Sequence, residues 1–173
     1  LPIVLVQHMP PLFTRLLAER LNDSCNLTVH EAADGEPVTA GKILIAPGGY
    51  HMRVHGQAGK CFAKLDQSPP LNSCRPAVDA LFESVAEVFG GNVLTIMLTG
   101  MGQDGLKGTE ILKARGAYTI AQDQETSGVW GMPGAVVQAG LADQILPLNE
   151  IGAAMQMYCQ RNPARMQHQQ RAS

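Results

Sequence analysis

The 173-residue chain is long enough for one domain with a sizeable hydrophobic core. Its net charge of -2 leaves no basic excess to neutralise nucleic-acid phosphates, and its 45% hydrophobic content is ordinary for a soluble globular protein. Apolar runs such as residues 93–98 are much shorter than the roughly 20 residues that a membrane-spanning helix needs. We therefore expect neither a nucleic-acid partner nor membrane insertion.

Short apolar runs alternate with helical patterns along the chain. The runs that we expect to form strands are residues 3–6, 27–31, 42–46, 93–99, 118–121 and 143–146. Helical spacing of apolar residues predicts helices at 12–21, 78–89 and 107–114, a short helix ending at 138, and a last helix at 150–160. Asn149 is the expected N-cap of that last helix. Two alternating runs, 52–55 and 61–65, are joined by a glycine-containing turn, which is typical of a β-hairpin.

Strands that alternate with helices predict an α/β fold. We expect a doubly wound, mostly parallel sheet with helices on both faces and a small antiparallel hairpin beside it. The sequence contains no internal repeat and no linker that would divide it. The expected organisation is therefore one domain at residues 1–161, followed by a polar C-terminal tail at 162–173.

The four cysteines are scattered and form no C-x-x-C pair. We therefore expect reduced thiols, as in the cytosol, and not a disulfide framework or a structural zinc site. His51 and His55 have the spacing of a helical metal pair, but they lie in an alternating run, where four residues of a strand span about 13 Å. A third ligand is also missing, so we expect neither a metal nor a cofactor.

Ligands of an open parallel sheet bind beyond the carboxyl ends of its strands, where this chain offers His8, Asp104 and Asp123. Asp104 lies in the loop 100–105, which matches the dinucleotide pattern G-x-G-x-x-G. A carboxylate in that turn would repel a pyrophosphate, which counts against dinucleotide binding. The simplest alternative for Asp104 is capping of the helix that follows.

A histidine and an aspartate on neighbouring strand ends can form the base and the orienting acid of a hydrolase. His8 and Asp104 fit that arrangement, although a histidine with ordinary structural hydrogen bonds is the simpler reading of His8. Such a pair needs a nucleophile, and the serines are poor candidates. Ser127, after a strand end, is the least unfavourable, and no G-x-S-x-G motif is present.

Six motifs, in one order along the chain, carry a specific resemblance. They are QHMPPLFT at 7–14, IAPGG at 45–49, RPAVD at 75–79, LTGMGQDG at 98–105, TIAQD at 119–123 and GMP at 131–133. From Leu1 to about Tyr158, the chain resembles the catalytic domain of the bacterial chemotaxis protein-glutamate methylesterases.

This resemblance implies an enzyme that hydrolyses γ-glutamyl methyl esters on the cytoplasmic helices of chemoreceptors and, in many members, deamidates receptor glutamines. It implies that His8 is the general base and that Asp104 orients it in a Ser-His-Asp triad. The backbone N–H of Met101 is expected to bind the tetrahedral oxyanion. The expected partners are methylated chemoreceptor helices, and the expected location is the cytoplasm.

The sequence also departs from the family. The family's nucleophile lies in a Gly-Ala-Ser-Thr-Gly-Gly loop before the His-Met-Pro strand, and neither that loop nor the family's receiver domain is among these residues. We therefore expect the chain as given to be inactive for want of its serine. Cys74 stands where many members carry histidine, and Gly134 where arginine often follows Met-Pro. A non-catalytic receptor-binding relative and, behind it, a nucleotide-binding domain using the loop 100–105 remain the alternatives.

Overall fold

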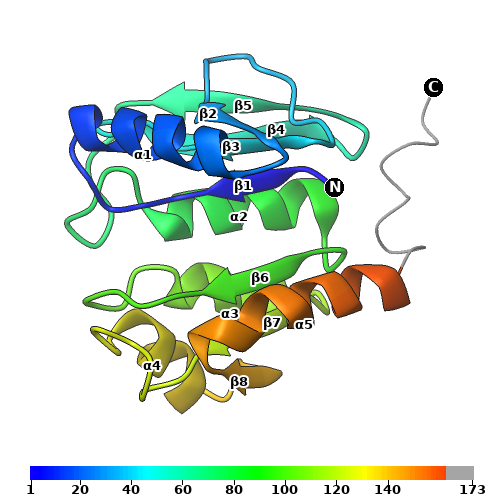
Figure 1. Cartoon of the computed structure of the whole chain (residues 1–173). Coiled ribbons are helices and arrows are strands. Elements are labelled where there is room, and N and C mark those ends of the chain that lie inside the picture. The colour runs from blue at the N-terminus through cyan, green and yellow to red at the C-terminus, as the bar shows by residue number, and fades with distance from the viewer. Residues whose placement is uncertain (163–173) are drawn as a thin grey trace.

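The computed structural model describes residues 1–162 (Figure 1). The predicted polar tail therefore lies outside the described residues from 163 onwards. Strands and helices alternate along the chain except between residues 28 and 66, where four strands follow one another without a helix. The strands are β1 (Ile3–Leu5), β2 (Thr28–Glu31), β3 (Lys42–Ile45), β4 (His51–Gln57), β5 (Lys60–Asp66), β6 (Leu94–Met97), β7 (Tyr118–Gln122) and β8 (Gln144–Leu146). The helices are α1 (Pro11–Ser24), α2 (Val78–Phe89), α3 (Leu106–Ala114), α4 (Met132–Gln138) and α5 (Leu148–Arg161).

The parallel strands form two three-stranded sheets. One has the order β1-β3-β2 and the other β6-β7-β8, with every neighbour parallel. β4 and β5 form a separate antiparallel hairpin. The predicted α/β class, parallel pairing and hairpin are confirmed. The difference from the expectation is that the parallel strands are divided between two sheets, with β1 at the edge of one and β6 at the edge of the other.

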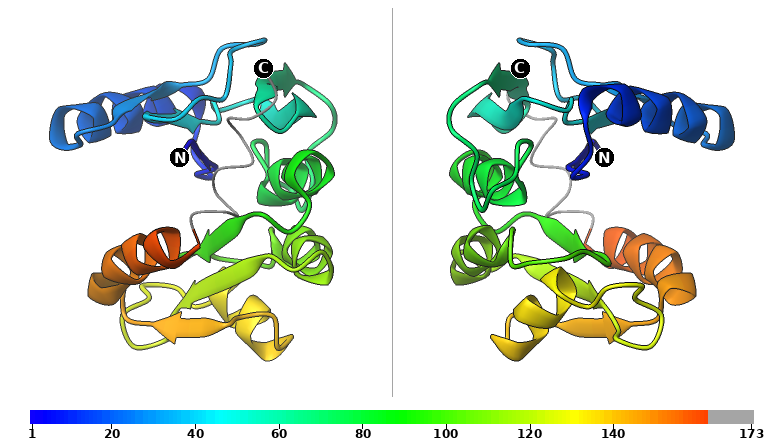
Figure 2. Two further views of the ribbon diagram at one scale, coloured as in Figure 1. Left: turned by 90° about the vertical axis from the view of Figure 1, so that its right-hand side faces the viewer. Right: turned by 90° about the vertical axis from the view of Figure 1, so that its left-hand side faces the viewer.

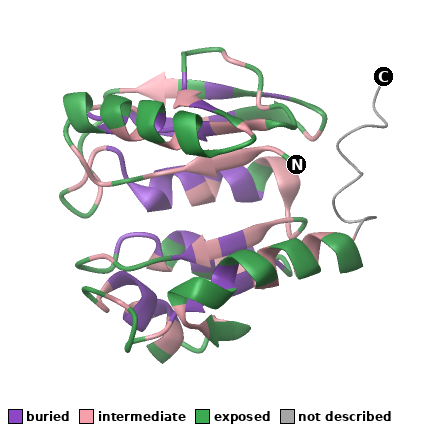
Figure 3. Cartoon of the chain, viewed as in Figure 1, coloured by how far each residue is buried: buried purple, intermediate pink, exposed green. Residues whose placement is uncertain are grey.

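Helices cover both faces of the parallel strands. In Figure 2, α1 and α5 lie on one side and α2 and α3 on the other, as a doubly wound fold requires. Figure 3 shows that α2 is mostly buried and α1 mostly exposed; α1 buries Thr14 and Ala18 alone. None of the helices within residues 1–162 is long and apolar enough to cross a membrane.

Two clusters of apolar side chains anchor α2. In the larger one, Leu81 of α2 packs with Leu44 of β3, Met52 of β4 and Leu112 of α3, each at most 1% exposed. Burial of each such side chain contributes about 1.5–3 kcal/mol. In the smaller cluster, Val78 at the start of α2 packs with buried residues of β6 and α4. The N-terminus of α2 is therefore fixed against the second sheet as well as the first.

The last helix begins one residue before the predicted cap. α5 starts at Leu148 after Pro147, and no side chain caps it. Pro147 has a φ of -65°, the value that its ring imposes and that suits a helix start. The backbone N–H of Leu148 donates to Oγ1 of Thr126 at 3.0 Å. Asn149 lies inside the first turn, so its prediction as the N-cap is wrong.

Candidate active site

His8 and Asp104 meet at the carboxyl ends of β1 and β6. His8 follows β1, Asp104 lies in the loop between β6 and α3, and Nε2 of His8 is 2.7 Å from Oδ2 of Asp104. The structure therefore brings together two candidates that are 96 residues apart in the chain. Asp123 bonds within its own turn instead, where its Oδ1 accepts from the backbone N–H and the hydroxyl of Thr126.

The Asp104 carboxylate is buried and receives four hydrogen bonds. Oδ2 accepts from His8 and from the backbone N–H of Val78 at 2.6 Å, while Oδ1 accepts from the Asn72 amide at 3.0 Å and the Asp79 N–H at 3.2 Å. Burial alone would raise the pKa of this carboxyl, but the hydrogen bonds from His8, Val78, Asn72 and Asp79 outweigh burial and lower that pKa. Asp104 is therefore ionised at neutral pH.

The same carboxylate caps a helix, although not the predicted one. Val78 and Asp79 are the first two residues of α2, so Asp104 satisfies two of the N–H groups at its N-terminus and opposes its positive dipole end. α3 begins after Gly105, which has a φ of 90° and provides no side-chain cap. The prediction that Asp104 caps α3 is therefore wrong. Asp104 caps α2 and contacts His8 at the same time.

The ionised carboxylate fixes the tautomer of His8. A carboxylate can only accept, so Nε2 of His8 carries the proton and donates it to Asp104. In the neutral ring, Nδ1 is then unprotonated and can accept a proton. The His8 side chain is 25% exposed, which leaves the ring accessible to a reacting group.

Asn72 is also part of this site, although the sequence did not predict it. Its Nδ2 donates both to Asp104 and to Oδ2 of Asp79, the latter at 2.8 Å, while Oδ1 of Asp79 accepts from the Gly108 N–H at 2.7 Å. One amide therefore bridges two buried carboxylates. Asn72 has a φ of 50°, a conformation that asparagine tolerates better than most residues. The only signal in the sequence was an asparagine shortly before the RPAVD motif.

The loop that carries Met101 is held against the GMP motif. The carbonyl of Gly100 accepts from the N–H groups of Gly131 and Met132 at 3.0 and 2.8 Å. A Cβ at Gly100 would lie 2.5 Å from Sδ of Met132, and one at Gly131 would lie 2.8 Å from the Gly100 carbonyl oxygen. Met101 is 82% exposed, and among residues 1–162 its N–H has no hydrogen-bond partner. This N–H is therefore available to an incoming oxygen.

Cys74 and Gly134, the two residues that differ from the family pattern, have different surroundings. Cys74 is partly buried in the loop before α2, where burial and then the charge of Asp104 raise the pKa of its thiol. At Gly134, a Cβ would lie 2.9 Å from the ring of Trp130, whose indole N–H donates to the Gln122 carbonyl at 3.1 Å. An arginine at position 134 therefore requires a shift of Trp130.

The other residues singled out in the sequence lie elsewhere. The Ser127 hydroxyl donates to the Asp123 carbonyl at 2.6 Å. The serine that was the least unfavourable nucleophile therefore bonds within a local turn. His51 is fully buried with its Nε2 bonded to the Pro69 carbonyl, whereas His55 is exposed and stacks on Phe62. Because of these separate environments, the two histidines do not form a metal pair.

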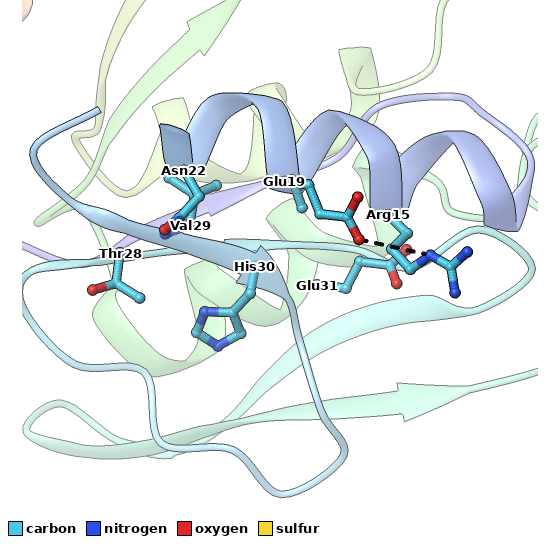
Figure 4. A pocket seen from close by; sticks show the side chains of 8 residues that line it. Arg15, Glu19, Asn22, Thr28, Val29, His30 and Glu31 are labelled. Atoms are coloured by element: carbon cyan, nitrogen blue, oxygen red, sulfur yellow. Dashed lines mark hydrogen bonds and ion pairs between the residues drawn. The ribbon is translucent and has the colours of Figure 1, made fainter. Parts of the chain in front are cut away.

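A cavity of about 380 Å³ lies between α1 and β2, away from the His8–Asp104 pair. Figure 4 shows Arg15 and Glu19 of α1 near Glu31 of β2, whereas the ring of His30 lies on the side of β2 away from α1. Its lining residues are Arg15, Ala18, Glu19, Asn22, Thr28, Val29, His30 and Glu31. This cavity therefore contributes nothing to the geometry around Asp104.

The chain is similar to known proteins of one family. The family model described as CheB methylesterase matches residues 1–155. A protein-glutamate methylesterase/protein-glutamine glutaminase of Trichodesmium erythraeum (strain IMS101) is 53% identical over 150 residues, which cover 87% of this chain and 43% of the relative. The protein of the same name from Maricaulis maris (strain MCS10) is 54% identical over 151 residues, 87% of this chain and 38% of the relative.

The fold agrees with a solved structure. The crystal structure of the Thermotoga maritima CheB methylesterase catalytic domain matches with a TM-score of 0.84 and 48% identity, over 87% of this chain and 79% of that one. The chain spans less than half the length of the two relatives named above. The family model covers most of the chain, and therefore this chain belongs to the CheB methylesterase family.

Proposed function

We propose that this chain is the catalytic domain of a protein that hydrolyses γ-glutamyl methyl esters on the cytoplasmic helices of chemoreceptors. The observation that carries the proposal is the 2.7 Å hydrogen bond between His8 and the buried, ionised Asp104. The names of the relatives support hydrolysis of protein-glutamate methyl esters and deamidation of protein glutamines, and the chemoreceptor as substrate follows from the resemblance. The whole protein then works in the cytoplasm, and the greater length of the relatives leaves room for a phosphorylatable receiver domain.

In this mechanism His8 is the general base. Its Nδ1 takes the proton of a serine hydroxyl as the serine oxygen attacks the ester carbonyl, and returns that proton to the departing methoxide, which leaves as methanol. Asp104 keeps the proton of Nε2 in place and stabilises the imidazolium that forms. The free N–H of Met101 donates to the tetrahedral oxyanion. Water then gives a proton to His8 and attacks the acyl-serine, and the serine oxygen leaves with that proton as the glutamate is released. A glutamine would lose ammonia instead of methanol.

The nucleophilic serine is not among these 173 residues, and we place it on a strand and loop N-terminal to His8, as the resemblance implies. Among residues 1–162, β1 and β6 each pair with one strand only, and their other edges face one another between the two sheets, which supports this placement (Figure 1). One parallel strand paired with both would join the sheets in the order β2-β3-β1, new strand, β6-β7-β8. Its carboxyl end would then lie beside His8 and Asp104.

The test is methanol release from a methylated chemoreceptor by the purified full-length protein. The proposal expects turnover that is lost when the serine of the upstream loop is replaced by alanine. Receptor binding without methanol release, by a protein that contains that loop, would contradict the proposal and favour a non-catalytic relative.

A further inference from the structure

Cys74 places a thiol beside the His8–Asp104 pair. One ligand atom from each of His8, Cys74 and Asp104 lies within 4.8 Å of the other two. The three side chains come from different parts of the fold, namely the segment after β1, the loop before α2 and the loop after β6. Their proximity therefore depends on how these three segments pack together.

We propose that His8, Cys74 and Asp104 bind a borderline-soft divalent cation of the zinc class and that this cation blocks the esterase. An imidazole nitrogen, a thiolate and a carboxylate oxygen together suit Zn²⁺ or Co²⁺, and not Mg²⁺ or Ca²⁺, which prefer oxygen ligands alone. Bonds of about 2.0–2.3 Å hold the ligands of a tetrahedral zinc ion about 3.4–3.6 Å apart. The cluster reaches that geometry with shifts of about 1 Å, which rotation of a single cysteine side chain and a small movement of the imidazole supply.

The carboxylate is already held in place for such a site. The hydrogen bonds from Val78, Asn72 and Asp79 leave Asp104 one position to offer, the one that His8 now occupies. A cation between His8 and Asp104 replaces only the shared proton, and the other three donors continue to orient the carboxylate. Metal sites depend on such outer hydrogen bonds for both affinity and geometry.

The charges and protons balance in this exchange. Bonds form from the cation to Nε2 of His8, Sγ of Cys74 and Oδ2 of Asp104. The thiol proton leaves to solvent, and the His8 proton moves from Nε2 to Nδ1, so one proton is released for each cation bound. The group changes from a net charge of -1 to 0, which lowers the cost of holding the cation in a partly buried site.

The cation therefore inhibits by blocking the base. Once Nδ1 carries the proton, His8 cannot accept one from a serine, and Asp104 is bound to the cation instead of to the imidazole. This consequence rests on the proposed function, whereas binding of the cation does not.

Cobalt titration of the full-length protein tests the site directly. Co²⁺ bound to a thiolate gives a charge-transfer band in the near-ultraviolet, which Zn²⁺ should abolish by displacement. We expect Cys74→Ser to remove the band and to weaken zinc binding about 100-fold or more. Cys25→Ser is the matched control, because Cys25 is exposed just after α1, and it should keep the band. Cys74→His should lose the band but still bind Zn²⁺ in calorimetry, because imidazole is also a zinc ligand.

Zinc inhibition of methanol release, measured relative to each variant's rate without the cation, tests the consequence. Absence of the band, or a band that survives Cys74→Ser, would overturn the cation site. Methanol release that continues at saturating Zn²⁺ would overturn the blocking of His8. A Cys74-dependent band in a protein that never releases methanol would leave the cation site standing and remove the proposed function instead.

Discussion

Two histidine–carboxylate pairs have the same hydrogen-bond length of 2.7 Å: His8 with Asp104, and His30 with Glu36. Asp104 has a side chain that is 2% exposed, and all of its other donors are neutral amide and backbone N–H groups. Glu36 is 12% exposed, and the oxygen that contacts His30 also accepts from the Lys42 ammonium at 3.0 Å. Lys42 offsets the negative charge that would otherwise stabilise an imidazolium on His30. The two pairs therefore differ in burial and in the ammonium at the carboxylate, and not in distance. We expect only the His8–Asp104 pair to act in catalysis.

Replacement of the two histidines should give the largest difference in activity between the two pairs. His8→Ala in the full-length protein should reduce methanol release about 10⁴-fold or more, because the serine loses its base. His30→Ala should stay within about threefold of wild type, since His30 lies on a different part of the surface. Assay of both variants against a methylated receptor checks this, and equal losses would show that the two pairs are not functionally distinct.

Replacement of the two carboxylates should give the second largest difference in turnover number. Asp104→Asn keeps the shape but favours the wrong tautomer of His8, so the turnover number should fall about 10⁴-fold, as in triads generally. Glu36→Gln should change it by less than about threefold. Steady-state kinetics on the two variants measure the difference, and an Asp104→Asn enzyme with near wild-type turnover would remove Asp104 from the mechanism.

Removal of the bridging amide should have a smaller effect. Asn72→Ala leaves Asp79 and Asp104 each without one donor, which should cost about 1–3 kcal/mol of unfolding free energy. Turnover should also fall about tenfold, because Asp104 is held less firmly. Asn22→Ala is the control, since it also loses one hydrogen bond, from the Val29 N–H, at a distance from the pair. Urea denaturation and kinetics together separate the two variants, and equal loss of turnover would contradict a positioning role for Asn72.

Acid sensitivity should be common to both pairs. The pKa of Glu36 is lowered like that of Asp104, because hydrogen bonds from His30, Ala33 and Lys42 outweigh its burial. A carboxyl with a lowered folded pKa stabilises the protein above its unfolded pKa, and this stability is lost as the pH falls through the folded value. Below about pH 5, unfolding free energies of Asp104→Asn and Glu36→Gln should therefore decline less steeply than that of wild type. Parallel slopes for all three proteins would contradict these pKa directions.

Met101 should give the smallest effect. Its exposed side chain is not expected to contribute, because the backbone N–H is the proposed donor. Met101→Ala should keep turnover within about twofold of wild type. A loss of a hundredfold would show that the thioether itself acts on the substrate.

The fold was largely predictable where periodicity and burial agree. The stripe of Val78, Leu81 and Val85 marked α2 at its observed bounds, and the buried run before Thr99 marked β6. The division into two sheets could not be read from periodicity, which marks strands and not their partners, and the strand proposed N-terminal to His8 would join the two sheets. Pro147 also took the helix start that Asn149 was expected to cap, since a fixed φ competes with side-chain capping.

The site was predictable only where a motif marked it. His8 and Asp104 stood out because histidine and aspartate followed strand ends within recognisable motifs. Capping of α2 by Asp104 could not be read from the sequence, because α2 begins 26 residues before that aspartate and on another part of the fold. Asn72 could not be predicted either, because a loop amide that joins two carboxylates leaves no periodic pattern in the sequence.

A double-mutant cycle on methanol release tests the central claim, that His8 and Asp104 act as one unit. The cycle compares the full-length wild type with His8→Ala, Asp104→Asn and the double variant, all against the same methylated receptor. Residues that act as a unit are strongly non-additive, so the double variant should be no slower than His8→Ala alone. Losses that multiply, so that the double variant falls about 10⁴-fold below His8→Ala, would contradict it.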